Sequence, residues 1–379
     1  MSLFFLPYLF IVLILFFFYL NEIGRIRALT AKSSRWIAYI IMWVFIGLRG
    51  HIMSDFISYY PFYEFLPNIF NLSLDDFIIG FEPGFIIYSA IIKTFTNNYF
   101  TWVAINTLID LCVFAWLFRK YCSSMILPLI FFIVFNGLLI EFNLYRNVKA
   151  IDLFLLSIPY LQSRKFLPYL LLNLVGVTFH TSSILYIPLY SVLNKKMSLF
   201  IVWGGFIIAN IVFLFKIGII GNIINNISFM QSMDAYDKIM RYSQNSEAYG
   251  ISMGYIERTF AFVYFFSLYK KVLLKKPFFC IFYNCFWIYY CTFLFFYEVT
   301  ILTERIPYLF IFSYWILYPK TFDIKYYYRN LIEVIVSVLI LMKIYSSYNN
   351  TASEYETCVF SEPNYEHRKQ IYEQSNDYL

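Results

Sequence analysis

The chain has 379 residues, of which 61% are hydrophobic and only 14% are charged. A soluble domain carries about 25% charged residues, so this composition excludes an ordinary soluble enzyme. The net charge of +6 is dispersed among short loops, and we therefore expect no nucleic-acid partner. The apolar residues come in blocks of about 15–22, the length at which a helix crosses a bilayer. The sequence predicts an all-α, polytopic membrane protein.

The first part of the chain predicts spans joined by basic loops. Lys and Arg in short loops stay on the cytoplasmic side, and the basic stretch at 21–35 therefore places the N-terminus outside. The first apolar run has neither a basic start nor a cleavage-site pattern, which favours a span over a signal peptide. We expect spans at about 2–20, 36–49, 100–118, 124–142 and 147–161.

Residues 50–99 are predicted to form an external loop. Its apolar run at 83–95 has a core of about 11 residues, which is too short to cross a bilayer. Pro83 suits the first turn of a helix. We predict a helix near 83–95 that lies on the outer membrane surface or dips partway into it.

Residues 166–193 allow two interpretations. A single span would place the basic residues that follow, at 194–196, outside. Two short segments joined near His180 would place them inside, as the positive-inside rule prefers. We predict two segments, at about 166–179 and 181–193, while a single tilted, broken helix remains an alternative.

The second part of the chain predicts five more spans, at about 198–216, 256–274, 277–297, 299–318 and 331–346. The polar insertion at 217–255 is predicted to be external, and loops of this length are often binding loops or lids. The acidic tail at 347–379 is expected outside and partly disordered. Residues 1–346 then form a single transmembrane domain of about 12 helices with both termini external.

This topology gathers charged side chains from separate parts of the chain on the external side. They are Arg49, Asp55, Glu82, Arg146, His180, Glu304 and Arg305. Charged groups at membrane depth are costly and by default indicate a functional site, so we expect one external polar cavity. Arginine forks match phosphate oxygens bidentately, and a histidine or carboxylate beside them can take a proton from a sugar hydroxyl.

Each of these residues also has a structural interpretation. Arg146 would snorkel to the headgroup boundary, and Arg305 would pair with Glu304. His180 would cap a helix end, and Asp55 would be an ordinary loop acid.

Other polar residues lie deeper in the predicted spans. Asp110 and Asp152 are interpreted as groups that pair helices, with Asp152 meeting Lys149 one turn back. The six cysteines show no metal-ligand spacing and are interpreted as small core residues. No nucleotide-binding motif and no cluster of metal ligands is present in the sequence, so we expect neither a cofactor nor a metal.

Five stretches, in the same order, resemble the O-antigen and capsule repeat-unit polymerases, the Wzy proteins, and particularly their EpsG-type branch. They are Arg49 with SDFISYYPFY, then FEPGFIIYSAI, YRNVKAIDLFLLSIPYLQSRK, FHTSSILYIPLY and ERIPYLF. The chain departs from the pattern at two points. Met53-Ser54-Asp55 stands where the family often has a Gly-Thr-Asp-like triplet, and Arg146-Asn147 stands where it often has Arg-Gln.

The resemblance implies a multi-pass bacterial inner-membrane glycosyltransferase with a GT-C-like helical fold and an active site facing the periplasm. It would transfer a growing glycan from undecaprenyl diphosphate to a lipid-linked oligosaccharide repeat unit, in O-antigen or capsule biosynthesis, without a metal or cofactor. Its implied partners are the undecaprenyl diphosphate-linked oligosaccharide, the lipid bilayer and a chain-length regulator protein.

The resemblance also assigns roles to residues. Arg146 and Arg305 would hold the diphosphate, His180 would be the first candidate for the general base and Glu82 the second, and Asp55 with Tyr59 would position a sugar or lipid head. The catalytic candidates are His180, Glu82 and Asp55, and the substrate-binding candidates are Arg49, Tyr59, Arg146, Glu304 and Arg305.

Two other functions use similar chemistry. A flippase or transporter of lipid-linked oligosaccharide would also need a cationic cavity, but it should show an internal repeat, and we find none in the sequence. An O-antigen ligase would carry out the same reaction on a different acceptor.

Overall fold

The computed structural model describes residues 3–78, 80–218, 250–324, 329–360 and 363–376. In these residues the regular secondary structure is helical, as predicted, with one isolated antiparallel bridge between Arg49 and Thr357. The chain forms two compact units: Met1–Tyr190 with Lys325–Leu379, and Ser191–Ile324. Each unit is described by itself.

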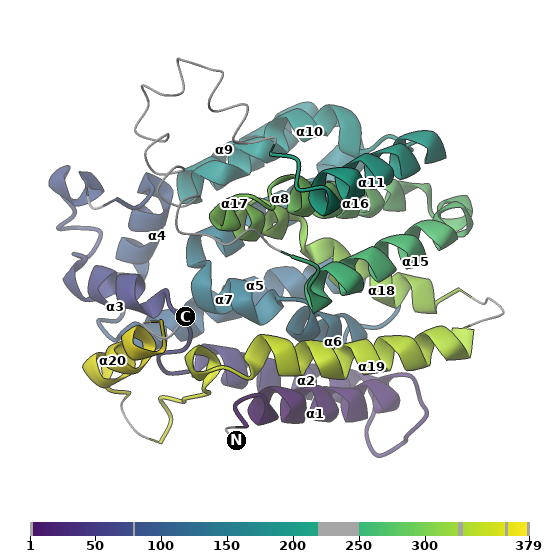
Figure 1. Ribbon diagram of the computed structural model, residues 1–379. Helices are drawn as coiled ribbons and strands as arrows, with labels where there is room; N and C mark the ends of the chain where they lie inside the picture. The colour runs from purple at the N-terminus through teal and green to yellow at the C-terminus, as the bar shows by residue number, and fades with distance from the viewer. Residues whose placement is uncertain (1–2, 79, 219–249, 325–328, 361–362, 377–379) are drawn as a thin grey trace. The chain divides into compact units, whose positions relative to one another are not determined.

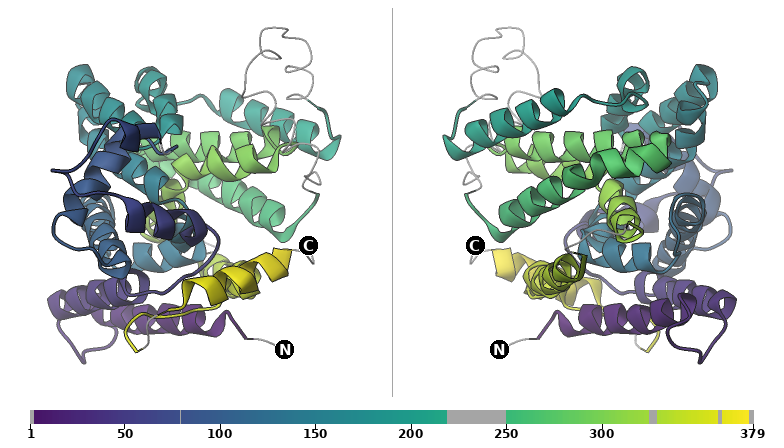
Figure 2. Two further views of the ribbon diagram at one scale, coloured as in Figure 1. Left: turned by 90° about the vertical axis from the view of Figure 1, so that its left-hand side faces the viewer. Right: turned by 90° about the vertical axis from the view of Figure 1, so that its right-hand side faces the viewer.

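The first unit contains most of the helices (Figure 1). They are α1 (Leu6–Glu22), α2 (Ala31–Gly47), α3 (Phe56–Phe65), η1 (Asp75–Ile78), α4 (Pro83–Lys93), α5 (Tyr99–Tyr121), α6 (Leu127–Val134), α7 (Gly137–Asn143), α8 (Tyr145–Gln162), α9 (Phe166–Phe179), η2 (Thr181–Leu185), α10 (Tyr186–Leu193, which runs past the unit boundary), α19 (Arg329–Tyr348), η5 (Thr351–Ser353) and α20 (Tyr365–Asn376). In Figures 1 and 2, α19 lies beside α1, and it also contacts α6.

The second unit is built around α16 (Cys280–Phe295), which contacts most of its other helices. These are α11 (Leu199–Leu214), α15 (Met253–Lys275), η3 (Pro277–Phe279), α17 (Thr300–Arg305), η4 (Pro307–Phe310) and α18 (Phe312–Phe322). The predicted insertion at 217–255 lies mostly outside the described residues, which resume at Gly250.

Three helices in the described residues are long and apolar enough to cross a membrane: Tyr99–Tyr121, Pro277–Phe295 and Asn330–Tyr348. Shorter apolar helices include Leu6–Glu22 and Leu199–Leu214. The number of spans, about twelve, therefore stays a prediction. A helix does begin at Pro83, as predicted, and its position on the membrane surface also stays a prediction.

Two stretches that were predicted as continuous spans are interrupted. The one at 124–142 divides into α6 and α7, because Asn136 has a φ of 57° and the following Gly137 packs against Phe132 where a Cβ would not fit. Asn tolerates this left-handed conformation better than most residues. The stretch at 299–318 divides into α17, η4 and α18. Pro307 lacks the N–H that a continuous helix needs there, and it begins η4 instead.

The prediction of two short segments at 166–193 is confirmed. His180 is extended, with φ −154° and ψ 124°, and it separates α9 from η2. The Phe166 ring, at the start of α9, lies 5.0 Å from the Tyr190 ring, near the end of α10, and the Tyr169 hydroxyl donates to the Tyr186 carbonyl at 2.5 Å. The chain therefore turns back at His180, and it enters and leaves this hairpin on the same side.

The tail that was predicted to be partly disordered is ordered over residues 350–360 and 363–376, which we call the C-terminal segment. It pairs with the stretch after α2: the Gly50 N–H donates to the Glu356 carbonyl (2.8 Å), and the Met53 N–H donates to the Ala352 carbonyl (2.8 Å). Tyr365, on α20, donates to the Ile57 carbonyl at 3.1 Å. Acidic composition predicted disorder, but these backbone pairs are not visible in composition.

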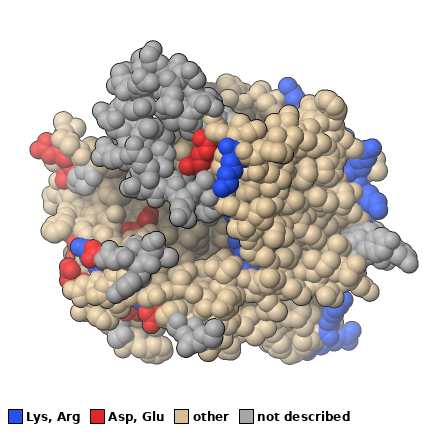
Figure 3. Space-filling model, viewed as in Figure 1, with Lys and Arg blue, Asp and Glu red and all other residues tan. Residues whose placement is uncertain are grey.

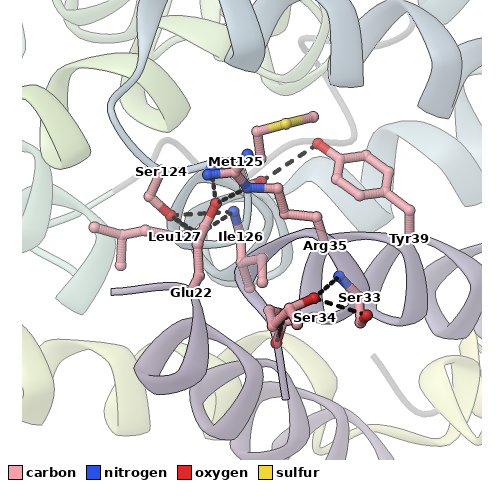
Figure 4. A network of polar contacts seen from close by, with 10 residues as sticks. Glu22, Ser33, Ser34, Arg35, Tyr39, Ser124, Met125, Ile126 and Leu127 are labelled. Atoms are coloured by element: carbon pink, nitrogen blue, oxygen red, sulfur yellow. Dashed lines mark hydrogen bonds and ion pairs between the residues drawn. The ribbon is translucent and has the colours of Figure 1, made fainter. Parts of the chain in front are cut away.

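At the other end of the first unit, a buried carboxylate joins three segments (Figure 4). Glu22 accepts hydrogen bonds from the backbone N–H groups of Met125 and Ile126, at 3.0 and 3.2 Å, and pairs with Arg35 at 2.6 Å. An acid beside a helix N-terminus is stabilised by the free N–H groups there. In Figure 3 basic side chains gather where α1 meets α2, and acidic ones gather on the side of α3, α4 and α20.

Candidate functional site

Four predicted site regions meet in the first unit. They are the starts of α3, α4 and α8 and the turn after α9, which carry Tyr59, Glu82, Arg146 and His180. An aromatic core lies beneath them, with Tyr59, Phe62, Phe85, Trp102 and Tyr145 among its members. We call Tyr59, Glu82, Arg146, His180 and Thr181 the polar cluster.

Arg146 is the centre of the polar cluster. Its Nη1 atom lies 2.5 Å from Glu82 Oε2, and its Nε atom donates to the Tyr59 hydroxyl at 3.2 Å. The guanidinium also stacks over the Phe81 ring, 4.8 Å from its centre. Nη2 makes no hydrogen bond among the described residues, and 21% of the side chain is exposed. One edge of the guanidinium is therefore available to a ligand.

Glu82 is held at the start of α4 by the residues after it. Pro83 occupies the first turn, and the Glu82 side chain makes no capping hydrogen bond to the helix. Instead, Oε1 accepts a hydrogen bond from the Thr181 N–H at 3.2 Å, while Oε2 binds Arg146. Gly84 allows this approach, because a Cβ at this position would overlap the Thr178 side chain on α9. One carboxylate thus links α4, α8 and the turn after α9.

His180 lies in the turn between α9 and η2 and is 92% buried, with 8% of its surface exposed. Its Nδ1 atom accepts the Ser182 N–H at 3.1 Å and lies 2.9 Å from the Ser182 hydroxyl. An N–H donor requires that Nδ1 be unprotonated, so the neutral ring carries its proton on Nε2. Since the backbone N–H of its neighbour Thr181 binds Glu82, the turn that carries His180 adjoins Glu82 and Arg146, and a role for the His180 ring stays a prediction.

Asp55 begins α3, one turn before Tyr59. Its Oδ1 atom accepts from the Ser54 hydroxyl at 3.2 Å, and Asn143 Oδ1 holds the Ser54 and Asp55 N–H groups at 3.1 and 3.4 Å. Burial raises the pKa of Tyr59 above its ordinary value, against the lowering effect of Arg146. Tyr59 is therefore a neutral donor and acceptor beside the guanidinium.

Met53, which stands where the Gly-Thr-Asp pattern has glycine, has a strained backbone. Its φ is 63°, in the left-handed region that glycine adopts most readily. The Met53 N–H pairs with the Ala352 carbonyl in the C-terminal segment. The conformation that the pattern's glycine favours is thus retained here with a methionine.

Arg49 was predicted to bind substrate, but it lies inside the unit with 2% of its surface exposed. Its guanidinium donates to the Ile46 and Glu141 carbonyls, at 2.5 and 2.7 Å, and to the Tyr145 hydroxyl at 2.7 Å. In this arrangement Arg49 joins α2, α7 and α8. A direct role in binding substrate stays a prediction.

Arg305 and Glu304 belong to the second unit, at the end of α17. Arg305 is exposed and makes no hydrogen bond or ion pair within the described part of the chain. The side chain of Glu304 lies outside the described residues. Their assignment to substrate binding stays a prediction.

The deeper charges do pair helices. Lys149 on α8 forms an ion pair with Asp110 on α5 at 2.5 Å, and it also donates to the Asn106 carbonyl at 3.1 Å. The expected partner, Asp152, is buried on α8 and lies close enough to interact electrostatically with both. The ion pair therefore crosses between helices instead of linking adjacent turns of one helix.

Three contributors to the site were missed in the sequence: Phe81 beneath the guanidinium, Asn143 at the start of α3, and the Thr181 N–H that binds Glu82. Phe81 is adjacent to Glu82, so an aromatic residue beside a predicted site acid was an available signal. The other two contacts depend on tertiary packing and leave no local pattern.

No curated protein and no solved structure matches the chain. The EpsG family matches residues 32–361, which cover the polar cluster, the charged residues of α17 and the first part of the C-terminal segment. The match and the apolar helices together indicate a membrane protein of the polysaccharide-polymerase type, with glycosyltransferase-like activity. The chain belongs to the EpsG family.

Proposed function

We propose that this protein is a glycosyltransferase of the bacterial inner membrane that polymerises oligosaccharide repeat units on the periplasmic side. It transfers a growing glycan from undecaprenyl diphosphate to a hydroxyl of a lipid-linked repeat unit, in O-antigen or capsule biosynthesis. The observation that carries the proposal is the polar cluster, in which an arginine with an available edge meets a carboxylate above an aromatic core.

The Arg146–Glu82 ion pair supports the handling of a diphosphate. A diphosphate competes with Glu82 for the guanidinium, because its oxygens match the arginine fork bidentately. Once Arg146 turns to the diphosphate, Glu82 loses its cationic partner while Thr181 still orients it. Binding of the leaving group thus releases a carboxylate beside it.

The released carboxylate suits a general base. In the reaction, the acceptor oxygen bonds to the sugar's anomeric carbon, the bond from that carbon to the phosphate oxygen breaks, and the hydroxyl proton moves to the base. The diphosphate leaves with the electron pair, and Arg146 stabilises its growing charge. His180 is less suited than Glu82 here, because its Nδ1 is occupied by the Ser182 N–H. Asp55 and Tyr59 would position the sugar, and Arg305, in the second unit, stays a candidate for binding substrate.

The test is genetic and uses the glycan itself. A strain lacking this protein should place single repeat units on the final acceptor. A flippase defect would instead leave none, and a ligase defect would leave free polymer on the lipid carrier. Either of those two profiles overturns the proposal.

Complementation with variants then tests the residues. Arg146→Lys keeps the charge but loses the fork, and we expect polymer yield to fall at least about tenfold. Glu82→Gln removes the base, and we expect a loss of about a hundredfold or more. His180→Ala should lower the polymer yield less than Glu82→Gln does. If His180→Ala lowers it more, His180 is the better candidate for the general base. Arg119→Gln, at an exposed site on α5, is the matched control and should polymerise normally.

A further inference from the structure

Within the described part of the chain, three arginines have less than a tenth of their surface exposed: Arg49 at 2%, Arg368 at 6% and Arg258 at 7%. A buried guanidinium is costly unless its N–H donors are used. Arg49 donates to four acceptors, and Arg368 donates to four carbonyls and the Glu354 carboxylate. These two arginines have the saturated pattern of structural residues.

Arg258, near the start of α15 in the second unit, does not follow this pattern. Among the described residues it donates a single hydrogen bond, from Nε to the Tyr289 hydroxyl at 2.8 Å. Both terminal nitrogens, which carry four N–H donors, make none. Arg258 is therefore a largely buried cation whose terminal N–H groups are not used by the described residues, and such donors can bind an anion.

Two aromatic rings and a glycine surround the guanidinium of Arg258. The group lies over the Phe293 ring, 3.9 Å from its centre, and beside Tyr289, both on α16. Gly254, one turn earlier on α15, has no side chain, and a Cβ there would come within 2.5 Å of Arg258 Nη1. The aromatic rings hold the plane of the guanidinium, and their low polarity strengthens its attraction for an anion.

The position along α15 places Arg258 toward the outer leaflet. The C-terminal part of this helix carries Lys270, Lys271 and Lys275, which the positive-inside rule assigns to the cytoplasm. Twelve residues of helix separate Arg258 from Lys270, a rise of about 18 Å. Tyr308, three residues after Arg305, lies close enough to interact electrostatically with Arg258.

We infer that Arg258 is an anion-binding residue of the second unit that takes a phosphate or diphosphate group at the outer membrane surface. Its chemistry fits the diphosphate of a lipid-linked oligosaccharide or the phosphate of a lipid headgroup. The anion site itself does not depend on the proposed function. Only the choice of the lipid-linked oligosaccharide as the source of the anion rests on that function. Glu257, the adjacent buried carboxylate, tempers the positive charge and would let the anion dissociate.

The experiment measures binding directly, on the full chain in nanodiscs of phosphatidylcholine. Farnesyl diphosphate is the probe, and its affinity and stoichiometry are read by titration. We expect Arg258→Gln to remove one binding event or weaken it about tenfold or more, because charge-assisted hydrogen bonds to the anion are lost. Arg258→Lys should weaken it less, and Gly254→Ala should weaken it by displacing the fork without removing a charge.

Two controls separate binding from folding and from the proposed function. Arg119→Gln should bind the probe as wild type does. Thermal unfolding of each variant shows whether its fold is intact. If Arg258→Gln does not fold, the probe affinity of Gly254→Ala is the deciding measurement. Unchanged affinity and stoichiometry in folded Arg258 variants would overturn the inference. Arg146→Gln should leave the binding event at Arg258 in place. The proposed function, tested by polymer yield in Arg146 variants, and the anion site, tested by probe binding in Arg258 variants, can therefore fail independently.

The source of the anion is read from competition. If nanodiscs of phosphatidylglycerol abolish probe binding at Arg258, the site takes a lipid phosphate headgroup. If they leave it, and pyrophosphate competes, the site takes the diphosphate of the lipid-linked substrate. Both results support an anion site at Arg258.

Discussion

Glu82 shows how a few side chains set the geometry of the polar cluster. Its two oxygens bind Arg146 and the Thr181 N–H, so the carboxylate fixes both the cation and the turn that carries His180. The turn can come this close only because residue 84 is a glycine. The carboxylate of the polar cluster and the glycine that allows the close packing therefore lie two residues apart, in Glu82-Pro83-Gly84.

The role of Gly84 can be tested with one methyl group. In Gly84→Ala the added Cβ would overlap Thr178, and we expect a loss of about 1–3 kcal/mol in stability, the usual cost of overpacking. Thermal unfolding in detergent measures it. Gly204→Ala is the matched control, because a Cβ there meets nothing within 4 Å. Equal unfolding temperatures for the two variants would contradict a close α4–α9 contact.

His51 gives a prediction for pH. Its ring is buried among aromatic rings, including Phe56 at 4.9 Å and Tyr60 at 5.1 Å, and burial, followed by the charge of Arg368, lowers its pKa from 6.5 to about 4. In the unfolded chain His51 is therefore protonated below about pH 6.5, whereas in the folded protein it is protonated only below about pH 4. Stability contributed by the neutral ring is full above pH 6.5 and is lost as the pH falls.

We expect this loss to reach about 1–3 kcal/mol between pH 7 and pH 4.5. Glu354 and Glu356 also face this region, and burial raises the pKa of Glu356, which favours the folded state at low pH. His51→Phe keeps an aromatic ring among these neighbours and removes only the part of the pH dependence that comes from histidine. As the pH falls, the variant should gain stability relative to wild type; a difference in stability that stays constant would show that His51 does not titrate in this range.

At the scale of elements, the C-terminal segment is held by Arg368. Its guanidinium donates to the His51 carbonyl at 2.9 Å and to the Glu354 carboxylate at 2.7 Å. The His51 carbonyl belongs to the stretch that leads into α3, the helix of Tyr59 and Asp55. Arg368 therefore ties the end of the chain to a helix of the polar cluster.

Arg368→Gln should weaken this attachment by about 2–4 kcal/mol, because several buried carbonyls lose their donor. Limited proteolysis of the purified protein should then cut within 350–376 faster than in wild type. Glu366→Gln, an exposed change on the same helix, serves as the control. Resistance equal to wild type in Arg368→Gln would mean that the segment is held by other contacts.

The elements differ in how well the sequence predicts them. The helix at Pro83 and the turn at His180 follow from local rules, namely a proline that opens a helix and two basic flanks that must share a side. The break at Asn136 does not, because it depends on how Gly137 packs against Phe132. The charge of Arg49 was visible in the sequence, but whether its donors were already used inside the fold was not.

At the scale of the whole molecule, the orientation predicted from basic loops can be tested by labelling. With the six natural cysteines replaced, Asn71→Cys should react with a membrane-impermeant maleimide in cells whose outer membrane has been permeabilised. Ser163→Cys should react only after lysis. Both positions are exposed in the first unit. The opposite pattern would place the polar cluster on the cytoplasmic face and remove the periplasmic site.

The family match and the polar cluster make complementary contributions to this conclusion. The match extends over most of the chain but names no residue. The polar cluster adds contacts that the sequence suggested only through topology. Arg146, Glu82 and the turn that carries His180 belong to separate helical segments, and they meet in the first unit. Pairing partners, unlike membrane sides, are decided by packing and could not be read from loop charges.

The ion pair between Lys149 and Asp110 has a consequence for how the protein is made. Neither side chain would be tolerated alone by the lipid, where a single charge costs several kcal/mol, yet together they are buried between α5 and α8. The ribosome synthesises α5 well before α8, so the earlier helix must wait at the insertion machinery, or keep its carboxylate protonated, until its partner emerges. We therefore expect either that the two helices enter the bilayer together or that α5 enters first with Asp110 neutral.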